Sequence, residues 1–566
     1  MAKTPTFLAR TPVDVPNRSG FAMPFENMLT GTCGTLLPVL CKPVVPNETL
    51  SEEIMFEAEL PPMVSNFFGR VDLCFESFFV PNYLLWGGWD SFFTHPTANP
   101  IYPDGTPVAA KPHNIPWLMA RTQKGASEIF GVGTLADYLG AKCNPATTSS
   151  DASSMGCCSL PFLAYHRIYH DHYRNSVVQA PVFYEPGLYG NTNNHGGAPY
   201  AATAPYVSGV VNDQVGDNVF DFAYNSPDNY NSAELGDGVY LWELRQANFD
   251  LDYFTAATPQ PQAGSAATLT FSVAVDTNSG NGTGSFSIAS LRSQNAIQQW
   301  MERNNLVGYD YREQNYVQYG AYPKRTLDKC VYLGNYTEPV YNRSVFQTAQ
   351  PEQGNASANP FADSIGARFG ASQANGRAQL FNNFKATDHG YIVVLMSLRP
   401  HVYYGSGANR DLMMKHVGDV PFPLLSGVGD QPIYNYELLG FGSDANTSQV
   451  ANSVFGYIDQ YAHAKCCLDE VHGHMREGQA LSPFVLQRTF NMADGVVQIS
   501  SDFLEIPIDF MEQVKSFPSA VGGVDYWVSV FHNFNKISPL PVYSIPTLGR
   551  LPNTHVETVS RKKSTI

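Results

Sequence analysis

The sequence predicts a mainly β protein built as one β-sandwich with long loops between its strands. Only 15% of the 566 residues are charged, against about a quarter in an average soluble domain. The chain contains 40 prolines and 46 glycines, which interrupt long helices and favour short strands joined by shaped loops. Strand-like segments are spread over the whole length without an internal repeat, so one sandwich with large insertions is a better prediction than several domains.

Residues 1–50 are predicted to form an extended N-terminal arm that precedes a single domain at residues 51–566. Proline fixes φ and lacks a backbone N–H, so a proline-rich segment forms neither a helix nor a central strand. Such an arm gains order by lying along another surface, often that of a neighbouring subunit. The prolines concerned are Pro5, Pro12, Pro16, Pro24, Pro38, Pro43 and Pro46.

Later segments have the periodicity of strands. Residues 53–80 alternate apolar and polar positions until Pro81 and Asn82 end the pattern, and residues 269–275 alternate strictly. Residues 391–398 are almost continuously apolar, which predicts a strand buried on both faces. Residues 524–531 alternate again and predict the last strand.

Two helices and two long loops complete the predicted elements. Residues 160–174 carry aromatic side chains at steps of three and four, and the second helix covers residues 290–303, with Ser290 as its candidate N-cap. Residues 186–262 and 347–379 are rich in Gly, Asn and Ala with little periodicity, which predicts loops. The aromatic stripe of the first helix consists of Phe162, Tyr165, Tyr169 and Tyr173.

The charge of the chain argues against a nucleic-acid-binding body but leaves its two ends as candidates. The formal net charge is −16, whereas binding to phosphates requires clustered cations. Both ends are locally basic, so they are candidate contacts to DNA; the alternative is that these charges are simply solvated. The candidate residues are Lys3, Arg10, Arg18, Arg561, Lys562 and Lys563.

The cysteines indicate a reduced protein. Their number is odd, no CxxC pair occurs, and two pairs are adjacent in sequence, which is unsuited to a disulfide framework. The first residues lack the apolar core of a secretory signal, and no stretch approaches the 18 or so apolar residues of a membrane span. We therefore expect a soluble protein that folds where it is made. The nine cysteines are Cys33, Cys41, Cys74, Cys143, Cys157, Cys158, Cys330, Cys466 and Cys467.

No familiar catalytic or phosphate-binding motif is present, and no cofactor is indicated. Cys466, Cys467, His472 and His474 offer four ligands that zinc accepts, but adjacent cysteines chelate poorly. Two buried thiols beside surface imidazoles are the preferred interpretation. No metal site and no catalytic residue are predicted.

A second group of histidines lies on the first predicted helix. His166 and His170 are one turn apart and, with His172, could share a ligand or a proton. They lie beside the aromatic stripe, so we expect them to face solvent or an interface. Any two carboxylates could be imagined as a glycosidase pair, but the sequence gives no separation to test this.

Several segments together resemble the major capsid protein of the Microviridae, in its gokushovirus-like branch. The resemblance follows the family's order over nearly the whole chain, although Phe21-Ala22-Met23-Pro24 lacks the family's Asp and Cys466-Cys467 replaces a basic stretch. Each motif alone is modest, and their shared order carries the resemblance. The motifs include Phe78-Phe79-Val80-Pro81-Asn82, Leu160-Pro161-Phe162 with Tyr165, Val454-Phe455-Gly456-Tyr457 with Tyr461, and Pro541-Val542-Tyr543-Ser544-Ile545-Pro546.

The resemblance implies an eight-stranded viral jelly roll that assembles with itself into a T=1 icosahedral shell around circular single-stranded DNA. It implies a location in the virion, assembly in the host bacterial cytoplasm, and a small basic DNA-binding protein, a scaffolding protein and a host surface receptor as partners. Residues 186–262 are the candidate for the insertion that forms the threefold protrusion and contributes to host attachment.

Two other classes of function remain as alternatives. A β-sandwich carbohydrate-active enzyme would fit the aromatic and Asn-rich loops but would be expected to carry a signal peptide. A receptor-binding spike would also be rich in β-structure but would stop at a trimer. The shell-forming, non-enzymatic function is the preferred prediction.

Overall fold

The computed structural model describes most of the predicted sandwich. Most of the longest predicted loop, residues 186–262, lies outside the described residues. The described residues are 10–63, 68–86, 89, 115, 117–119, 130–142, 156–179, 241–260, 319, 329–346, 368–427, 430–442, 445–490, 495–515, 523–542 and 554–560.

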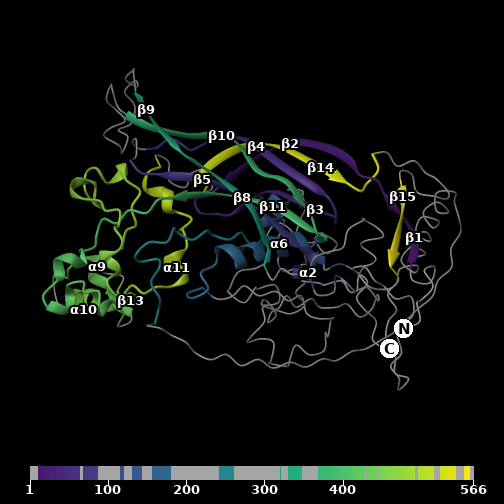
Figure 1. The fold of residues 1–566 in the computed structure, drawn as a ribbon. Coiled ribbons are helices and arrows are strands. Elements are labelled where there is room, and N and C mark those ends of the chain that lie inside the picture. Colours follow the sequence, from purple (N-terminus) through teal and green to yellow (C-terminus); the bar gives the residue numbers. More distant parts are fainter. Residues whose placement is uncertain are drawn as a thin grey trace, which may run out of the picture.

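Two antiparallel sheets face each other and form the body of the molecule (Figure 1). The first sheet has five strands in the order β2-β14-β4-β10-β9, and the second has four in the order β3-β11-β5-β8. The strands are β2 (Ser19–Gly31), β3 (Leu37–Val44), β4 (Thr49–Glu59), β5 (Val71–Pro81), β8 (Val331–Pro339), β9 (Tyr341–Phe346), β10 (Arg368–Lys385), β11 (Gly390–Pro400) and β14 (Tyr526–Ser538).

The order of these strands is that of a jelly roll. Successive strands β2, β3, β4 and β5 alternate between the two sheets, and so do β10, β11 and β14. Only Val340 separates β8, which pairs with β5, from β9, which pairs with β10, so this strand passes from one sheet to the other. Counted as one, they bring the two described sheets to eight strands, which confirms the predicted fold class.

The two sheets differ in what covers their outer faces. The helix α6 (Leu160–Ile168), continued by a π-helical turn at Tyr169–Tyr173, packs on β5 and β11 (Figure 1). This cover explains why β11 is buried on both faces, as its continuous apolar run predicts. On β14, in contrast, Tyr526, Val528 and Val530 are buried and Trp527 and Phe531 are exposed, so the five-stranded sheet is open on one side.

The prediction of an arm at residues 1–50 is wrong for β2 and β3, which are part of the sandwich. Both are edge strands, where a missing N–H can face away from the ladder. Pro24 lies opposite Asn533, and Pro43 lies opposite Tyr391. The prolines correctly predicted that these residues form no central strand, but they are compatible with edge strands, which the prediction overlooked.

Both predicted loops are partly wrong. Residues 241–260 at the end of the first loop enter the core, where Leu241, Phe249 and Phe254 are buried. Residues 368–379 of the second belong to β10. The remainder of both loops, the predicted strand at 269–275 and the predicted helix at 290–303 lie outside the described residues.

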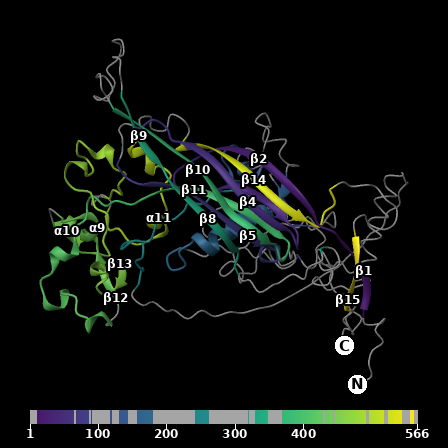
Figure 2. The ribbon, with the colours of Figure 1, turned by 45° about the horizontal axis from the view of Figure 1, so that its top comes forward.

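A large insertion separates β11 from β14 and lies at one end of the sandwich (Figures 1 and 2). At the other end, β1 (Arg10–Pro16) pairs with β15 (Thr554–Ser560) in a separate two-stranded sheet. The insertion contains β12 (Asp430–Tyr434), α9 (Asn435–Leu439), α10 (Ala445–Ala451), β13 (Val454–Asp459) and α11 (Ser501–Leu504). The other short elements are α2 (Asn82–Leu85), β6 (Trp117–Met119), α5 (Leu135–Leu139) and β7 (Gly156–Cys158).

Candidate functional site

The open face of the five-stranded sheet presents large apolar side chains to solvent. Met28 on β2 is 74% exposed and lies opposite Ser529 of β14. On the same face, Phe531 of β14 lies opposite the exposed Met55 of β4. Single exposed apolar residues are ordinary, but a group on one sheet face marks a contact surface.

Carboxylates surround this apolar group. The Nε1 of Trp527 donates to Glu59, 3.1 Å away, and the hydroxyl of Ser529 donates to Glu26, 2.6 Å away. Arg377 donates to Glu53 at 2.6 Å, and this hydrogen bond lowers the pKa of Glu53. Charge and apolar area are thus combined on one face, as at the rim of a protein interface.

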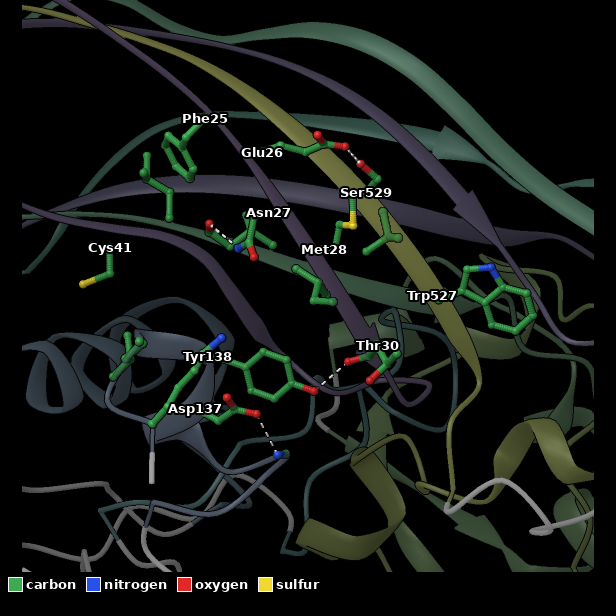
Figure 3. Close-up of a pocket in the computed structure, with 18 of the residues that line it drawn as sticks. Phe25, Glu26, Asn27, Met28, Thr30, Cys41, Asp137, Tyr138, Trp527 and Ser529 are labelled. Carbon is green, nitrogen blue, oxygen red and sulfur yellow. Dashed lines mark hydrogen bonds between the residues drawn. The ribbon is translucent and has the colours of Figure 1, made fainter. Parts of the chain in front are cut away.

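A groove of about 660 Å³ runs beside this face, along the edge where β2 and β3 lie next to each other (Figure 3). Asn27 bridges the two sheets by donating to the carbonyl of Val39 at 3.0 Å. Tyr138 of α5 closes the other side by donating to the carbonyl of Thr30 at 2.6 Å. Burial raises the pKa of Tyr138, so its hydroxyl remains a donor at neutral pH.

Among the described residues, the longest run of exposed apolar side chains is at residues 411–426 in the insertion. Leu412 is 80% exposed and Leu424 is 90% exposed, and nearly every residue between them is also exposed. Full burial of one such side chain contributes about 1.5–3 kcal/mol. A folded chain that leaves so many apolar side chains in water is stabilised when another surface covers them.

This segment is nevertheless held in a defined shape. At its start, Arg410 donates to the carbonyl of Pro432 at 2.7 Å and pairs with Glu437 at 3.1 Å. In its middle, the carboxylate of Asp419 accepts the backbone N–H of His416 at 2.8 Å, and Tyr461 donates to the carbonyl of Gly418 at 3.0 Å. Polar contacts to the rest of the insertion and within the segment therefore hold this exposed surface in place.

The comparisons with known proteins identify the family. Residues 10–283 and 274–548 match the family described as "Capsid protein (F protein)". The chain belongs to this capsid protein family. It is a major capsid protein, which confirms the resemblance to the Microviridae seen in the motifs, and its role is structural.

Three relatives share nearly the full length of this capsid protein. The capsid protein VP1 of Chlamydia phage 1 is 23% identical over 96% of this chain and 98% of its own length. The capsid protein VP1 of Bdellovibrio phage phiMH2K is 22% identical over 96% of this chain and 98% of its own. The capsid protein VP1 of Spiroplasma virus 4 is 22% identical over 94% of this chain and 96% of its own length.

The six candidate DNA contacts come from the two ends of the chain, and the structure brings those ends together. Arg10 of β1 lies opposite Ser560 of β15, the last described residue of that strand. The exposed Arg18 instead donates to the hydroxyl of Thr49 at 2.7 Å. The positions outside the described residues are Lys3, Arg561, Lys562 and Lys563.

The expectation for His166 is wrong, because the capsid protein buries this side chain completely. Its Nδ1 accepts from Nε of Arg245 at 3.0 Å, and its Nε2 lies 2.9 Å from the carbonyl of Leu241. Burial, with the charge of Arg245, lowers the pKa of His166, which keeps the ring neutral. His170 pairs with Asp171, so the two histidines share no ligand.

The interpretation of Cys466 and Cys467 as buried thiols is also wrong, since both are exposed. His472 pairs with Glu470 at 3.2 Å. Within the described residues, no group of three or more His, Cys, Asp or Glu side chains is placed to hold a metal ion. None of the helices in that part of the chain is long and apolar enough to cross a membrane.

Sequence reasoning missed the two main surfaces, residues 411–426 and the open sheet face. A signal existed for the first, because its apolar residues follow neither a helical nor a strand period and Pro421 and Pro423 interrupt them. The second had no local signal. Alternation on β14 identifies two faces, but only the packing of the sandwich decides which one stays open.

Proposed function

We propose that this capsid protein assembles with itself into a T=1 icosahedral shell that encloses circular single-stranded DNA. The observation that carries the proposal is the exposed apolar segment 411–426, which a neighbouring subunit would cover. The open sheet face, with Met28 and Phe531 among carboxylates, supplies a second contact surface. Two different surfaces on one subunit support closed shells, which need several distinct contacts around their axes.

Assembly by such surfaces is cooperative. Each contact between subunits can be weak, since closure of the shell makes every contact intramolecular with respect to the others. One charged residue in the centre of a contact is then enough to prevent closure, because the same defect is repeated at every symmetry-related position.

Electron microscopy of the purified protein, after size-exclusion chromatography, tests the proposal. Uniform isometric particles are expected for the wild type, Leu424→Asp should give unassembled but folded subunits, and Leu424→Met, which keeps the side chain apolar, should still assemble. A discrete trimer that is unchanged by salt or concentration would support the alternative spike function instead. If Leu424→Asp assembles as well as the wild type, segment 411–426 is not the contact.

We further propose that the paired ends of the chain contact the genome. The pairing of β1 with β15 supports this, because it sets Arg10 opposite Ser560, the residue that precedes Arg561-Lys562-Lys563 in the sequence. Binding of a single-stranded oligonucleotide should weaken with salt, and the double change Lys562→Ala with Lys563→Ala should reduce the slope of log K against log salt by about 1.4. Lys415→Ala, on the exposed insertion, is the matched control and should leave the slope unchanged.

The remaining partners are inferred from the family resemblance. A body with net charge −16 neutralises little of a polyanionic genome, which supports a small basic DNA-binding protein inside the shell. A scaffolding protein and assembly in the bacterial cytoplasm rest on the family resemblance. Residues 186–262 remain the candidate threefold protrusion and contact to a host surface receptor, with the partly buried stretch 241–260 as its anchor. Replacing residues 190–235 by a short Gly-Ser linker should leave particles intact and abolish adsorption to host cells; adsorption at the wild-type level would contradict this assignment.

A further inference from the structure

A buried lysine and a buried aspartate meet where the insertion returns to the sandwich. Lys515 follows the 3-10 turn Phe510–Gln513, and Asp525 directly precedes β14. The Nζ of Lys515 is in direct contact with Oδ1 of Asp525. Their side chains are 5% and 0% exposed, so water has almost no access to the pair.

The backbone fixes the carboxyl group of Asp525. Its Oδ2 accepts the N–H of Cys33 at 2.6 Å, and its own N–H donates to the carbonyl of Gly31 at 2.8 Å. Cys33 is fully buried. A backbone N–H aimed at one oxygen of a carboxyl group is the arrangement that stabilises an oxyanion during acyl transfer.

A second carboxylate completes the group. Oε1 of Glu512 lies 3.4 Å from Nζ of Lys515, and Glu512 is partly open to solvent. It can therefore accept a proton from the amine and pass it on. Lys515 also pairs through its backbone with the buried Met63, which limits the movement of the lysine.

We propose that Lys515 and Asp525 form an intramolecular amide bond, with Glu512 as the proton-transfer group. The neutral amine Nζ attacks Cγ of the protonated Asp525 carboxyl, and the N–H of Cys33 stabilises the negative charge that develops on Oδ2. Glu512 takes a proton from the nitrogen and returns it to Oδ1, which leaves as water. One N–C bond forms, one C–O bond breaks, and no oxidant or reductant is required.

Three physical effects favour this condensation. The reacting groups are held in contact, which replaces a bimolecular encounter by an intramolecular one. Burial raises the pKa of Asp525, which favours the protonated acid, although the hydrogen bonds of Lys515 and the Cys33 N–H oppose this. The exclusion of water from the site also disfavours the reverse reaction, hydrolysis of the amide.

The competing interpretation is a buried ion pair without covalent chemistry. Such a pair gains its Coulombic attraction against a large loss of hydration, and it leaves the mass of the chain unchanged. The amide removes both charges and ties the end of the insertion to the start of β14. The two interpretations therefore differ by the mass of one water molecule.

Mass spectrometry of the full-length protein under denaturing conditions tests the proposal. The wild type should be lighter than its sequence mass by one water, and proteolysis should give a branched peptide that joins Lys515 to Asp525. Glu512→Gln, a replacement of nearly equal shape, should restore the full mass, and so should Lys515→Arg. Glu505→Gln, a glutamate that bonds Gln179 and Ser501 elsewhere, should keep the wild-type loss of water.

The result that overturns the proposal is a folded wild-type protein with the full sequence mass and no branched peptide. Loss of water in Lys515→Arg would do the same, because it would place the reaction elsewhere. Because the measurement is made on the denatured chain, it does not depend on whether shells form, and its failure would leave the proposed shell function untouched. Circular dichroism of Glu512→Gln establishes that this variant is folded before its mass is interpreted.

Discussion

Glu52 on β4 and His532 on β14 form a buried pair inside the sandwich, with Oε1 of the glutamate 2.6 Å from Nδ1 of the histidine. Both side chains are fully buried, and the ring of Phe25 stacks on His532 at a centroid distance of 4.5 Å. The second oxygen of Glu52 and Nε2 of His532 have no hydrogen-bond partner among the described residues. The pair links two neighbouring strands, but the two buried polar atoms without a hydrogen bond lower the stability of the fold.

This pair predicts a loss of stability as the pH rises. Burial raises the pKa of Glu52 above its ordinary 4.5, although the hydrogen bond with His532 opposes the shift. A raised pKa in the folded state contributes stability below the unfolded-state pKa, and that contribution is lost as the pH rises through the folded-state value. The free energy of unfolding of the wild type, relative to Glu52→Gln, should therefore fall above about pH 4.5.

Urea unfolding of the unassembled subunit at a series of pH values measures this difference. A Glu57→Gln variant on the exposed face of the same strand is the control and should follow the wild type. A wild-type-minus-variant difference that stays constant from pH 4 to 8 would contradict the assignment.

Asp171 predicts the opposite dependence on pH. Its burial alone would raise its pKa, but hydrogen bonds from His170, the N–H of Cys330 and Arg167 outweigh this and lower the pKa below the ordinary 3.8. A lowered pKa contributes stability above the unfolded-state value, and acid removes that contribution as the pH falls. Asp171→Asn should therefore lower the free energy of unfolding at pH 7 by on the order of 1–3 kcal/mol, with a smaller effect in acid.

Guanidinium unfolding of Asp171→Asn at pH 7 and at pH 3 measures both effects. The exposed Asp459→Asn provides the comparison and should change the free energy of unfolding by less than about 0.5 kcal/mol. An Asp171→Asn effect that grows in acid would show that the carboxylate is not the stabilising form.

Phe254 should anchor the insertion to the core. Its ring is buried against Tyr404 and Phe455, at centroid distances of 5.0 and 5.9 Å. Phe254→Ala leaves a cavity and should lower the free energy of unfolding by about 3–5 kcal/mol. Leu251→Ala, three positions earlier and exposed, should change it by less than about 0.5 kcal/mol. Equal effects of the two changes, measured by thermal and urea unfolding, would place Phe254 outside the core.

Gly334 should be required where β8 passes close to β10. A Cβ at this position would collide with the carbonyl oxygen of Leu380, and overpacking of this kind costs about 1–3 kcal/mol. Gly334→Ala should lower the melting temperature, whereas Gly20→Ala, where a Cβ meets no atom within 4 Å, should not. Unchanged melting of Gly334→Ala would mean that the two strands can move apart freely.

Local pattern was sufficient wherever burial follows from the position along a strand or helix. Alternation at residues 524–531 predicted β14, and the continuous apolar run at 391–398 predicted a strand covered on both faces, because periodicity in sequence records which sides meet the core. The stripe of Phe162 and Tyr165 predicted α6 for the same reason. His166 was misplaced because Arg245, which buries it, comes from a distant segment.

The sequence by itself determined that this protein is a β-sandwich of the capsid family, because composition, periodicity and shared motifs are local properties. Only the tertiary structure decided that the proline-rich start of the chain is an edge of the sandwich, where Glu26 meets Ser529 across 503 positions of sequence. The contact between Lys515 and Asp525 also depends on the tertiary structure, and so does the exposure of segment 411–426 to solvent. Pairing between distant strands and the burial of their side chains depend on how the two sheets pack, which no short stretch of sequence predicts.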